Sequence, residues 1–312
     1  MKKIITILLT LVMIISMSAC NQKQEEAKGY TFGFTSMDNS NPFFTSILAA
    51  VQEKVEANGD KLIIVDATQD QQKQNDGITQ MIEEGIDGLF LNPFVSNEVD
   101  SALDALNAAG VPIVNFDTAV DSIEKVNTFV GTDNYAAGKL CGEDLVSRMP
   151  EGGKIVIVDF ATADSANNRI NGFLDAIDQK GFEVVGRADA HGDKNTAIEV
   201  TTKLLQENAD AKVVFAGNDP MAIGANAAAE ELGIKDVMIY GVDGSPEYIE
   251  ALSKNETLMA GTAAQSPAKI AEKIVEVMYE LLNGNSIQDT YLIETSLVTL
   301  ENVSEYDTSE WK

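Results

Sequence analysis

The chain has 312 residues, of which 22 are Lys or Arg and 49 are Asp or Glu, so its formal net charge is −27. Nucleic acid and anionic lipid are poor partners for such an acidic chain, because like charges repel. The single histidine leaves little room for imidazole chemistry or a metal site. We therefore expect neither a metal nor a cofactor.

The chain begins with the pattern of an export signal. Lys2 and Lys3 precede an apolar run over residues 4–15, and small residues follow at 16–19. A basic start, a short apolar core and a small-residue exit are typical of a secretory signal peptide, and the core is too short for a membrane span. Residues 1–19 are therefore predicted to be a signal peptide.

Cys20 stands where bacterial lipoproteins carry their lipidated cysteine, although Met17 departs from the usual aliphatic residue of that pattern. The polar residues 20–29 would then form a tether, and the protein would lie outside the cytoplasm, anchored to the membrane by lipid alone. The alternative is an ordinary signal peptide with a chance cysteine. With Cys20 lipidated, only Cys141 remains, so no internal disulfide can form, and we expect Cys141 to be buried on the apolar side of a helix.

From Tyr30 onward, apolar strands alternate with amphipathic helices, which predicts parallel sheets covered on both faces. The expected strands begin near Thr31, Leu62, Leu89, Ile113, Ile155, Val184, Val213 and Met238. The expected helices cover 42–58, 70–84, 96–109, 134–149, 164–180, 194–207, 219–232 and 245–253.

Eight strand–helix units could close into a barrel, but one interval is too long for it. Residues 113–155 contain an extra strand at 126–130. After the eighth unit come a strand at 258–263, a helix at 267–282 and a strand at 291–300. A closed barrel needs none of these, so we predict an α/β fold of two open sheets joined by several crossings of the chain.

The first strand-to-helix turn, residues 36–44, combines polar and aromatic side chains. Asn41 can cap the helix, and Pro42 suits its first position. Phe43 and Phe44 follow at once. Because open α/β sheets bind ligands at this edge, and because amide groups and flat rings suit hydroxyl-rich molecules, this turn predicts a sugar site.

The other strands also end in carboxylates or amides, which is a repeated chemistry at the ligand-binding edge. These residues are Asp66, Asn92, Asp117, Asp159, Asp189, Asn218 with Asp219, and Asp243. Asp and Asn also cap helices, and we expect Asp219, just before Pro220, to be such a cap.

Eight short motifs then occur in order along the chain. They are N-P-F-F at 41–44, L-N-P at 91–93, F-D at 116–117, G-T-D-N at 131–134, R-I-N-G-F at 169–173, A-G-N-D-P-M-A-I-G at 216–224, G-V-D-G at 241–244 and A-Q-S-P at 264–267. On these motifs the chain, from about Tyr30 to its C-terminus, resembles the bacterial sugar-binding proteins of ABC importers, of the ribose-binding type.

The resemblance implies two Rossmann-like lobes joined by three crossings, at 30–132 plus 266–292 and at 133–265 plus 293–312. A monomer of this type would close its lobes around one monosaccharide and deliver it to an importer permease, without catalysis. The ligand-binding residues that the resemblance implies are Asn41, Phe43, Phe44, Asn92, Asp117, Thr132, Arg169, Asn218, Asp243 and Gln265.

Two positions depart from the ribose-binding pattern. Thr118 stands where that pattern has arginine, and residues 190–193 lack its aromatic residue. His191 either replaces that aromatic wall or lies in a surface turn, and Asp38 and Asn39 have no firm counterpart. These changes bear on which sugar is bound, so ribose, another pentose and a hexose all remain open.

Three other functions fit parts of the pattern. In a sugar-processing enzyme, Asp117 and Asp243 would be an acid–base pair, but the chain has no metal-ligand cluster and no G-x-S-x-G motif. The effector core of a lac-type repressor would need a DNA-binding headpiece where the signal peptide lies. A sugar sensor that reports to a chemoreceptor or histidine kinase would use the same closed form as a transport protein, and the sequence does not separate the two.

Overall fold

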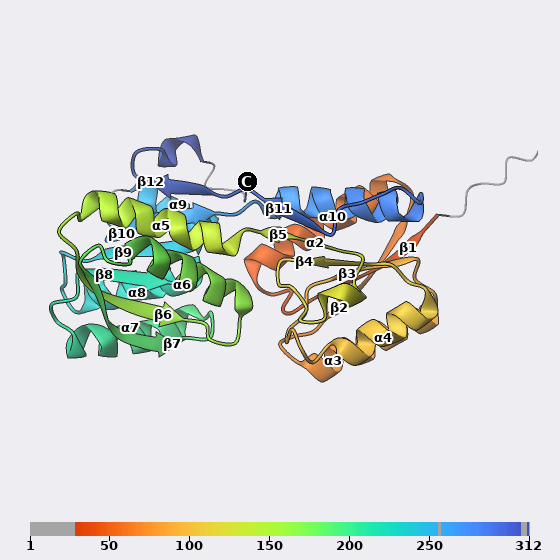
Figure 1. The fold of residues 1–312 in the computed structure, drawn as a ribbon, viewed down its shortest axis with the longest axis horizontal. Helices are drawn as coiled ribbons and strands as arrows, with labels where there is room; N and C mark the ends of the chain where they lie inside the picture. Colours follow the sequence, from red (N-terminus) through yellow and green to blue (C-terminus); the bar gives the residue numbers. More distant parts are fainter. Residues whose placement is uncertain (1–28, 255–256, 307–310, 312) are drawn as a thin grey trace, which may run out of the picture. The chain divides into compact units, whose positions relative to one another are not determined.

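The computed structural model describes residues 29–254, 257–306 and 311, in which two six-stranded sheets are flanked by helices (Figure 1). Contacts join the described residues from Thr31 onward into one compact unit. The predicted α/β fold with two open parallel-sheet lobes is confirmed, and the barrel is excluded. The predicted signal peptide, Cys20 and almost all of the tether lie outside the described residues.

The first sheet has the order β11-β5-β4-β3-β1-β2, and every pairing in it is parallel. Its strands are β1 (Thr31–Ser36), β2 (Lys61–Asp66), β3 (Gly88–Leu91), β4 (Ile113–Phe116), β5 (Thr128–Thr132) and β11 (Thr290–Ile293). Two pairs of helices cover its two faces: α2 (Pro42–Ala57) with α10 (Pro267–Leu282), and α3 (Gln71–Glu84) with α4 (Asp100–Ala109) (Figure 1). A short 3-10 helix, η1 (Ile123–Lys125), precedes β5.

The second sheet has the order β12-β10-β9-β8-β6-β7, and only its edge strand β12 is antiparallel. Its strands are β6 (Gly153–Asp159), β7 (Phe182–Asp189), β8 (Val213–Ala216), β9 (Met238–Asp243), β10 (Met259–Ala264) and β12 (Ser296–Thr299). Its helices are α5 (Asn134–Arg148), α6 (Asp164–Ile177), α7 (Lys194–Glu207), α8 (Asp219–Glu231) and α9 (Pro246–Ser253), and η2 (Val303–Glu305) follows β12.

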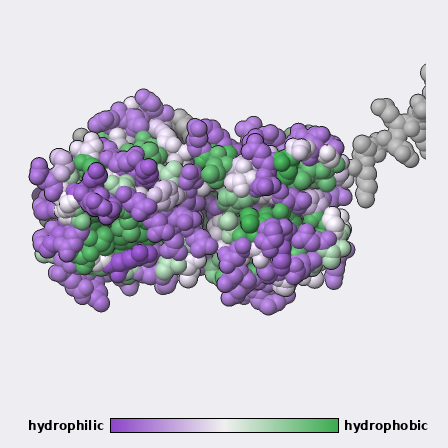
Figure 2. Space-filling model, in the orientation of Figure 1, coloured by the Kyte–Doolittle hydropathy of each residue, from purple (hydrophilic) through white to green (hydrophobic). Residues whose placement is uncertain are grey.

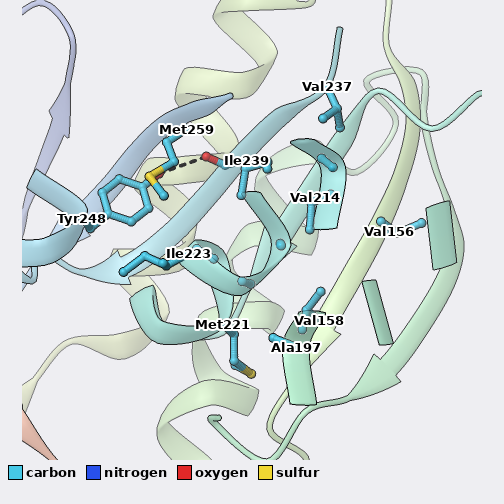
Figure 3. Close-up of a cluster of buried hydrophobic side chains, with 14 of the residues drawn as sticks. Val156, Val158, Ala197, Val214, Met221, Ile223, Val237, Ile239, Tyr248 and Met259 are labelled. Carbon is cyan, nitrogen blue, oxygen red and sulfur yellow. Dashed lines mark hydrogen bonds between the residues drawn. The ribbon is translucent and has the colours of Figure 1, made fainter. Parts of the chain in front are cut away.

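Strand β6 shows why the sequence reads as continuous apolar runs. Ile155 and Ile157 face the core formed with α5 and α6. Val156 and Val158 face the opposite core, formed with α7, α8 and α9 (Figure 3). Alternate residues of a strand point to opposite faces, so a sheet covered on both faces needs apolar residues at every position.

One predicted element is wrong. Residues 291–300 do not form one strand, because the chain changes sheets in the middle of the segment. Strand β11 pairs in parallel with β5 in the first sheet. Strand β12 then pairs antiparallel to β10 in the second. This is one of three crossings between the sheets; the others follow β5 and β10.

The helix starts confirm one predicted cap and correct another. Asn41 caps α2, accepting a hydrogen bond from the Phe43 N–H at 3.0 Å. At α8 the cap is Asn218, which accepts from the Met221 N–H at 3.0 Å. Asp219 is therefore not the cap, because the amide before it already fills that role, and its carboxylate is buried elsewhere.

The face of the molecule in Figure 2 is mainly hydrophilic, as expected from the many charged residues in the chain. Figure 2 shows a face dominated by hydrophilic residues and interrupted by smaller hydrophobic patches. The predicted burial of Cys141 is confirmed, and this burial raises the pKa of its thiol.

Within the described part of the chain, no helix has both the length and the apolar character to cross a bilayer.

Helices α5 and α6 pack closely because a glycine of each helix lies against the backbone of the other. A side chain on Gly138 would overlap the carbonyl of Arg169, and one on Gly172 would overlap that of Tyr135. This close approach sets the position of Arg169, whose Nε donates to Asn134 Oδ1 on the facing helix at 2.8 Å.

We predict that Gly138→Ala lowers the free energy of unfolding by about 1–3 kcal/mol, because the added methyl group pushes apart two packed backbones. Urea denaturation measures the loss. Gly153→Ala is the matched control, since the atom nearest to its added methyl group is the flexible end of Met149. Equal effects of the two substitutions would contradict this account of the helix pair.

Candidate functional site

One cavity in the described structure gathers residues from the carboxyl ends of both sheets. Eight of the ten predicted ligand-binding residues line it: Asn41, Phe43, Phe44, Asp117, Arg169, Asn218, Asp243 and Gln265. Strand ends of parallel sheets are the usual place for ligands in such folds. The cavity therefore lies where the pattern of strand-end polar residues predicts a site.

The other two predicted residues lie elsewhere. Asn92 is fully buried behind Asp117. Its Nδ2 donates to Asp117 Oδ2 at 3.2 Å, and its Oδ1 accepts from the Met37 N–H at 3.1 Å. Thr132 lines an adjoining cavity of about 280 Å³, which shares Asp117 and Ser165 with the first one. Asn92 thus supports Asp117, and Thr132 faces the neighbouring space.

Asp117 is a buried carboxylate in an unusual backbone conformation. It follows β4 with φ at 61°, the left-handed region that Asp and Asn tolerate best after glycine. Its Oδ2 accepts from Asn92 and from the Thr118 hydroxyl at 3.2 Å. Burial raises the pKa of Asp117 to about 6, although the positive charge of Arg169 opposes the change.

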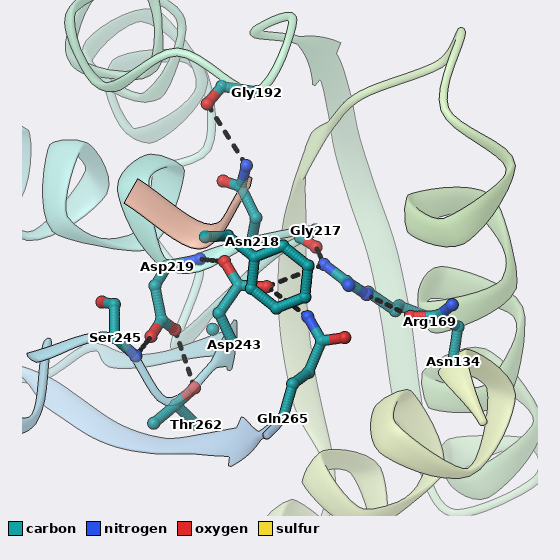
Figure 4. A network of polar contacts seen from close by, with 12 residues as sticks. Asn134, Arg169, Gly192, Gly217, Asn218, Asp219, Asp243, Ser245, Thr262 and Gln265 are labelled. Atoms are coloured by element: carbon teal, nitrogen blue, oxygen red, sulfur yellow. Dashed lines mark hydrogen bonds and ion pairs between the residues drawn. The ribbon is translucent and has the colours of Figure 1, made fainter. Parts of the chain in front are cut away.

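Asp243 is the last residue of β9, which holds the same place in its sheet as β4, and it also has positive φ, at 147°. Its Oδ1 accepts from Arg169 Nη1 at 3.2 Å and from Gln265 Nε2 at 2.7 Å (Figure 4). Its Oδ2 accepts from the Asp219 N–H at 3.2 Å. Burial raises the pKa of Asp243, and the Arg169 charge lowers it.

Arg169 is the only Lys or Arg among the residues that line the cavity. Besides Asp243, it binds Asn134 Oδ1 and, through Nη1 at 2.9 Å, the carbonyl oxygen of Gly217. The charged groups of the cavity lining are the carboxylates of Asp117 and Asp243 and the single guanidinium of Arg169, so carboxylates, which accept hydrogen bonds, outnumber the charged donor. The lining therefore favours ligands that bring their own O–H or N–H donors.

The aromatic part of the lining includes a residue that sequence reasoning missed. Phe43 and Phe44 lie edge to face at 5.4 Å between ring centres. Phe160, which follows β6, also lines the cavity, and its ring lies against Gly192. An aromatic residue thus fills the region near 190–193 from another loop. Its place directly after the strand-end residue Asp159 is the signal that could have found it.

His191 does not line the cavity. It lies in an exposed turn with 68% of its side chain accessible, where Nδ1 is 3.2 Å from Asp189 Oδ2. Asp38 and Asn39 do not line the cavity either: Asp38 accepts from Ser40 Oγ at 2.6 Å and from Gln69 Nε2 at 2.9 Å, and Asn39 Oδ1 accepts from Ser36 Oγ at 2.5 Å. Of the two possibilities for His191, the surface turn is the one observed.

Three more strand-end carboxylates are used structurally. Asp66 Oδ1 accepts from the N–H groups of Asn39 and Thr68, each at 3.0 Å. Asp159 pairs with Arg187 at 2.5 Å, and Asp189 with His191. None of the three lines the cavity. Among the described residues, no cluster of three His, Cys, Asp or Glu side chains is placed to hold a metal ion.

Fold and site together define a binding protein with a ligand cavity at the carboxyl ends of two parallel sheets. The chain belongs to the periplasmic binding protein domain family, whose model matches residues 32–286. The ribose import binding protein of Bacillus subtilis is 31% identical over 309 residues, which cover 96% of this chain and 99% of that protein. Relatives of this kind bind substrates for transport and are not enzymes.

Two solved structures extend the comparison. An ABC transporter solute-binding protein from Mycobacterium smegmatis, with bound glycerol, has a TM-score of 0.84 and 31% identity, covering 89% of this chain and 96% of its own. A solute-binding protein from Actinobacillus succinogenes 130z, with bound D-allose, has a TM-score of 0.83 and 25% identity, covering 89% of this chain and 100% of its own. The fold is thus shared with proteins that hold different polyhydroxy ligands.

We predict that Asp117→Asn stabilises the ligand-free protein at neutral pH. Because the folded pKa of Asp117 is about 6, against 3.8 for the free group, the folded state binds more protons between these values. Wild-type stability therefore falls as the pH rises through that window. Asparagine does not ionise and tolerates the same φ. The variant's advantage in unfolding free energy should grow by about 2–3 kcal/mol from about pH 4 to about pH 7.

Urea denaturation at the two pH values measures this difference. Asp189→Asn is the control, since that carboxylate lies outside the cavity and beside an exposed turn. An advantage of Asp117→Asn that stays constant with pH would show that burial does not disfavour the ionised carboxylate.

Proposed function

We propose that the protein captures one neutral monosaccharide, a pentose or a hexose, by closing its two lobes around it. The observation that carries this proposal is the pair of carboxylates, Asp117 and Asp243, that line one cavity beside Phe43 and Phe44. Each carboxylate can accept hydroxyl protons, and the rings can cover the C–H face of a sugar. Relatives named for ribose import, and structural neighbours that hold glycerol or D-allose, support a ligand of this class.

The charge of the cavity supports a neutral ligand over an acidic one. Burial and the nearby Asp243 charge already disfavour the ionised form of Asp117. A carboxylate or phosphate on the ligand would add a further negative charge where only Arg169 is positive. Like charges in a site of low dielectric repel strongly. Sugar acids and sugar phosphates are therefore excluded from the proposed ligand class.

The proposed role is delivery of the sugar to an ABC importer, by a monomer anchored to the extracytoplasmic side of the cell membrane through a lipid on Cys20. Its support is the export pattern of residues 1–19, the polar tether at 20–29 and the import function of its relatives. A ligand that binds the closed form more tightly makes closure a report of occupancy, which a permease can read.

We predict that the protein binds a neutral monosaccharide and rejects the matching sugar acid and sugar phosphate. A thermal-shift panel identifies the ligand, because binding to the folded state raises its stability. The single tryptophan, Trp311, gives a second readout, since its ring lies 5.5 Å from that of Phe43. Sugar recovered unchanged and in stoichiometric complex indicates binding, whereas turnover would refute the proposal.

Asp243→Ala tests the site assignment and should abolish saturable binding. The loss is expected because the substitution removes the acceptor that Arg169 and Gln265 hold in place. Asp189→Ala is the matched control, a strand-end carboxylate outside the cavity, and it should bind normally. Circular dichroism checks that both variants fold. Wild-type affinity in Asp243→Ala would place the sugar elsewhere.

We predict that Cys20→Ser abolishes incorporation of labelled fatty acid and releases the protein from the membrane fraction of a bacterial host. Cys141→Ser is the control, since that thiol is buried and no lipid can reach it. The control should keep both the label and the membrane association. A Cys20→Ser variant that still carries the label would disprove lipidation at this residue.

A further inference from the structure

Asp219 is a buried carboxylate that does not line the ligand cavity and does not cap its helix. Its Oδ2 accepts from the Ser245 N–H at 2.7 Å, and its Oδ1 accepts from Thr262 Oγ1 at 2.7 Å (Figure 4). A fully buried charge is costly unless its hydrogen bonds are made. Both oxygens of Asp219 make them, and both lead to the residues around Asp243.

The turn that follows β9 has an unusual backbone. Asp243 has φ at 147° and Gly244 has φ at 71°. A non-glycine residue in such a conformation is strained and persists only where its surroundings hold it. The N–H of Gly244 donates to Thr262 Oγ1 at 3.1 Å, and the N–H of Ser245 donates to Asp219. Asp219 and Thr262 therefore bind the two N–H groups that follow Asp243.

Asp219 also binds the Asp243 side chain directly. Its backbone N–H donates to Asp243 Oδ2, while Arg169 and Gln265 donate to Oδ1. The two carboxylates repel each other across this contact. Burial, and after it the charge of Asp243, raise the pKa of Asp219 to about 7. A second acid so close to the first opposes ionisation of Asp243, so its presence needs a compensating role.

We propose that Asp219 is a positioning residue of the sugar site, which acts with Thr262 to hold the backbone and carboxylate of Asp243 in the orientation that binds ligand. This inference rests on the proposed function, because it assigns Asp219 a role in sugar binding by Asp243. Asp219 itself contacts no sugar. Its effect on affinity passes through Asp243: its hydrogen bonds hold the Asp243 turn in place, and its negative charge opposes ionisation of the Asp243 carboxyl group.

Asp219→Asn is the first test. The amide offers a donor where the carboxylate accepts, so one of the bonds to Ser245 and Thr262 is lost. We expect the dissociation constant for the sugar found in the thermal-shift panel to rise about 10- to 100-fold, by analogy with residues that orient metal ligands through hydrogen bonds. Isothermal titration calorimetry measures it.

The pH profile of binding separates positioning from a general loss of structure. Sugar hydroxyls donate to ionised carboxylates, so affinity should fall as the pH drops and Asp117 and Asp243 are protonated; Arg169, which faces both, is the same in wild type and variant. The Asp243 charge raises the pKa of Asp219, and this coupling is reciprocal. In Asp219→Asn the part of the fall due to Asp243 should therefore occur at lower pH than in the wild type, while the part due to Asp117 stays in place. A purely structural effect would lower affinity without moving the profile.

The second test uses Thr262, in case Asp219→Asn folds poorly. Thr262→Val removes the hydroxyl that joins Gly244 to Asp219 and should weaken binding, whereas Thr262→Ser keeps the hydroxyl and should restore it. Asp144→Asn is the control: it removes a carboxylate that accepts from Tyr240 Oη at 2.7 Å and that does not line the cavity. It should lower stability without changing affinity.

The outcomes separate this inference from the function on which it rests. Unchanged affinity in both Asp219→Asn and Thr262→Val, in a protein whose wild type binds sugar, would overturn the inference alone. Failure of the wild type to bind any monosaccharide would overturn the proposed function and the inference with it. Weaker binding, a shifted pH profile and recovery with serine would support the assignment of Asp219.

Discussion

The buried carboxylates of Asp117 and Asp243 line one cavity and repel each other there. The surrounding side chains offset that repulsion with hydrogen bonds and one positive charge. Burial raises the pKa of both groups, and the charge of Arg169 opposes the change. Hydrogen bonds from Asn92 and Gln265 further favour the ionised forms. A buried carboxylate binds a hydroxyl donor strongly, because the donor's hydrogen bond offsets part of the hydration that burial removes.

Each of the two sheets places one of these buried carboxylates at the cavity in a similar way. Strand β4 and strand β9 hold the same place in the order of their sheets. Asp117 directly follows β4, Asp243 is the last residue of β9, and both have positive φ. An amide follows the neighbouring strand in each half, Asn92 after β3 and Asn218 after β8. The cavity is therefore assembled from two similar edges, each of which contributes one strained carboxylate. Strain of this kind is common where a side chain must be aimed at a ligand.

Much of this arrangement follows from the sequence, because alternating strands and helices fix which residues reach the ligand-binding edge. Asp117 and Asp243 were predictable for that reason, since strand ends are local features. Phe160 was missed although it directly follows the strand-end residue Asp159, because the sequence does not show that this loop reaches the region near 190–193. Asp219 was misread as a cap, since Asn218 beside it has the same capping chemistry. The change of sheet within 291–300 falls at the polar residues 294–296, and the lobe boundary at 292/293 that the resemblance implies already places a crossing there; the apolar residues on either side nevertheless read as one strand.

The ligand-binding residues lower the free energy of unfolding, and contacts deep in the second lobe hold these residues in place. A buried Asp117 that ionises at neutral pH lowers stability, and a strained Asp243 lowers it further. The close contact of α5 with α6 fixes Arg169, and the buried Asp219 fixes the turn after β9, so two sets of rigid contacts hold the groups that a ligand must meet. Preorganisation of this kind reduces what binding must spend on ordering side chains. The folded protein is less stable because the carboxylates are buried and held in place, and a ligand that donates hydrogen bonds to both of them binds more tightly for the same reason.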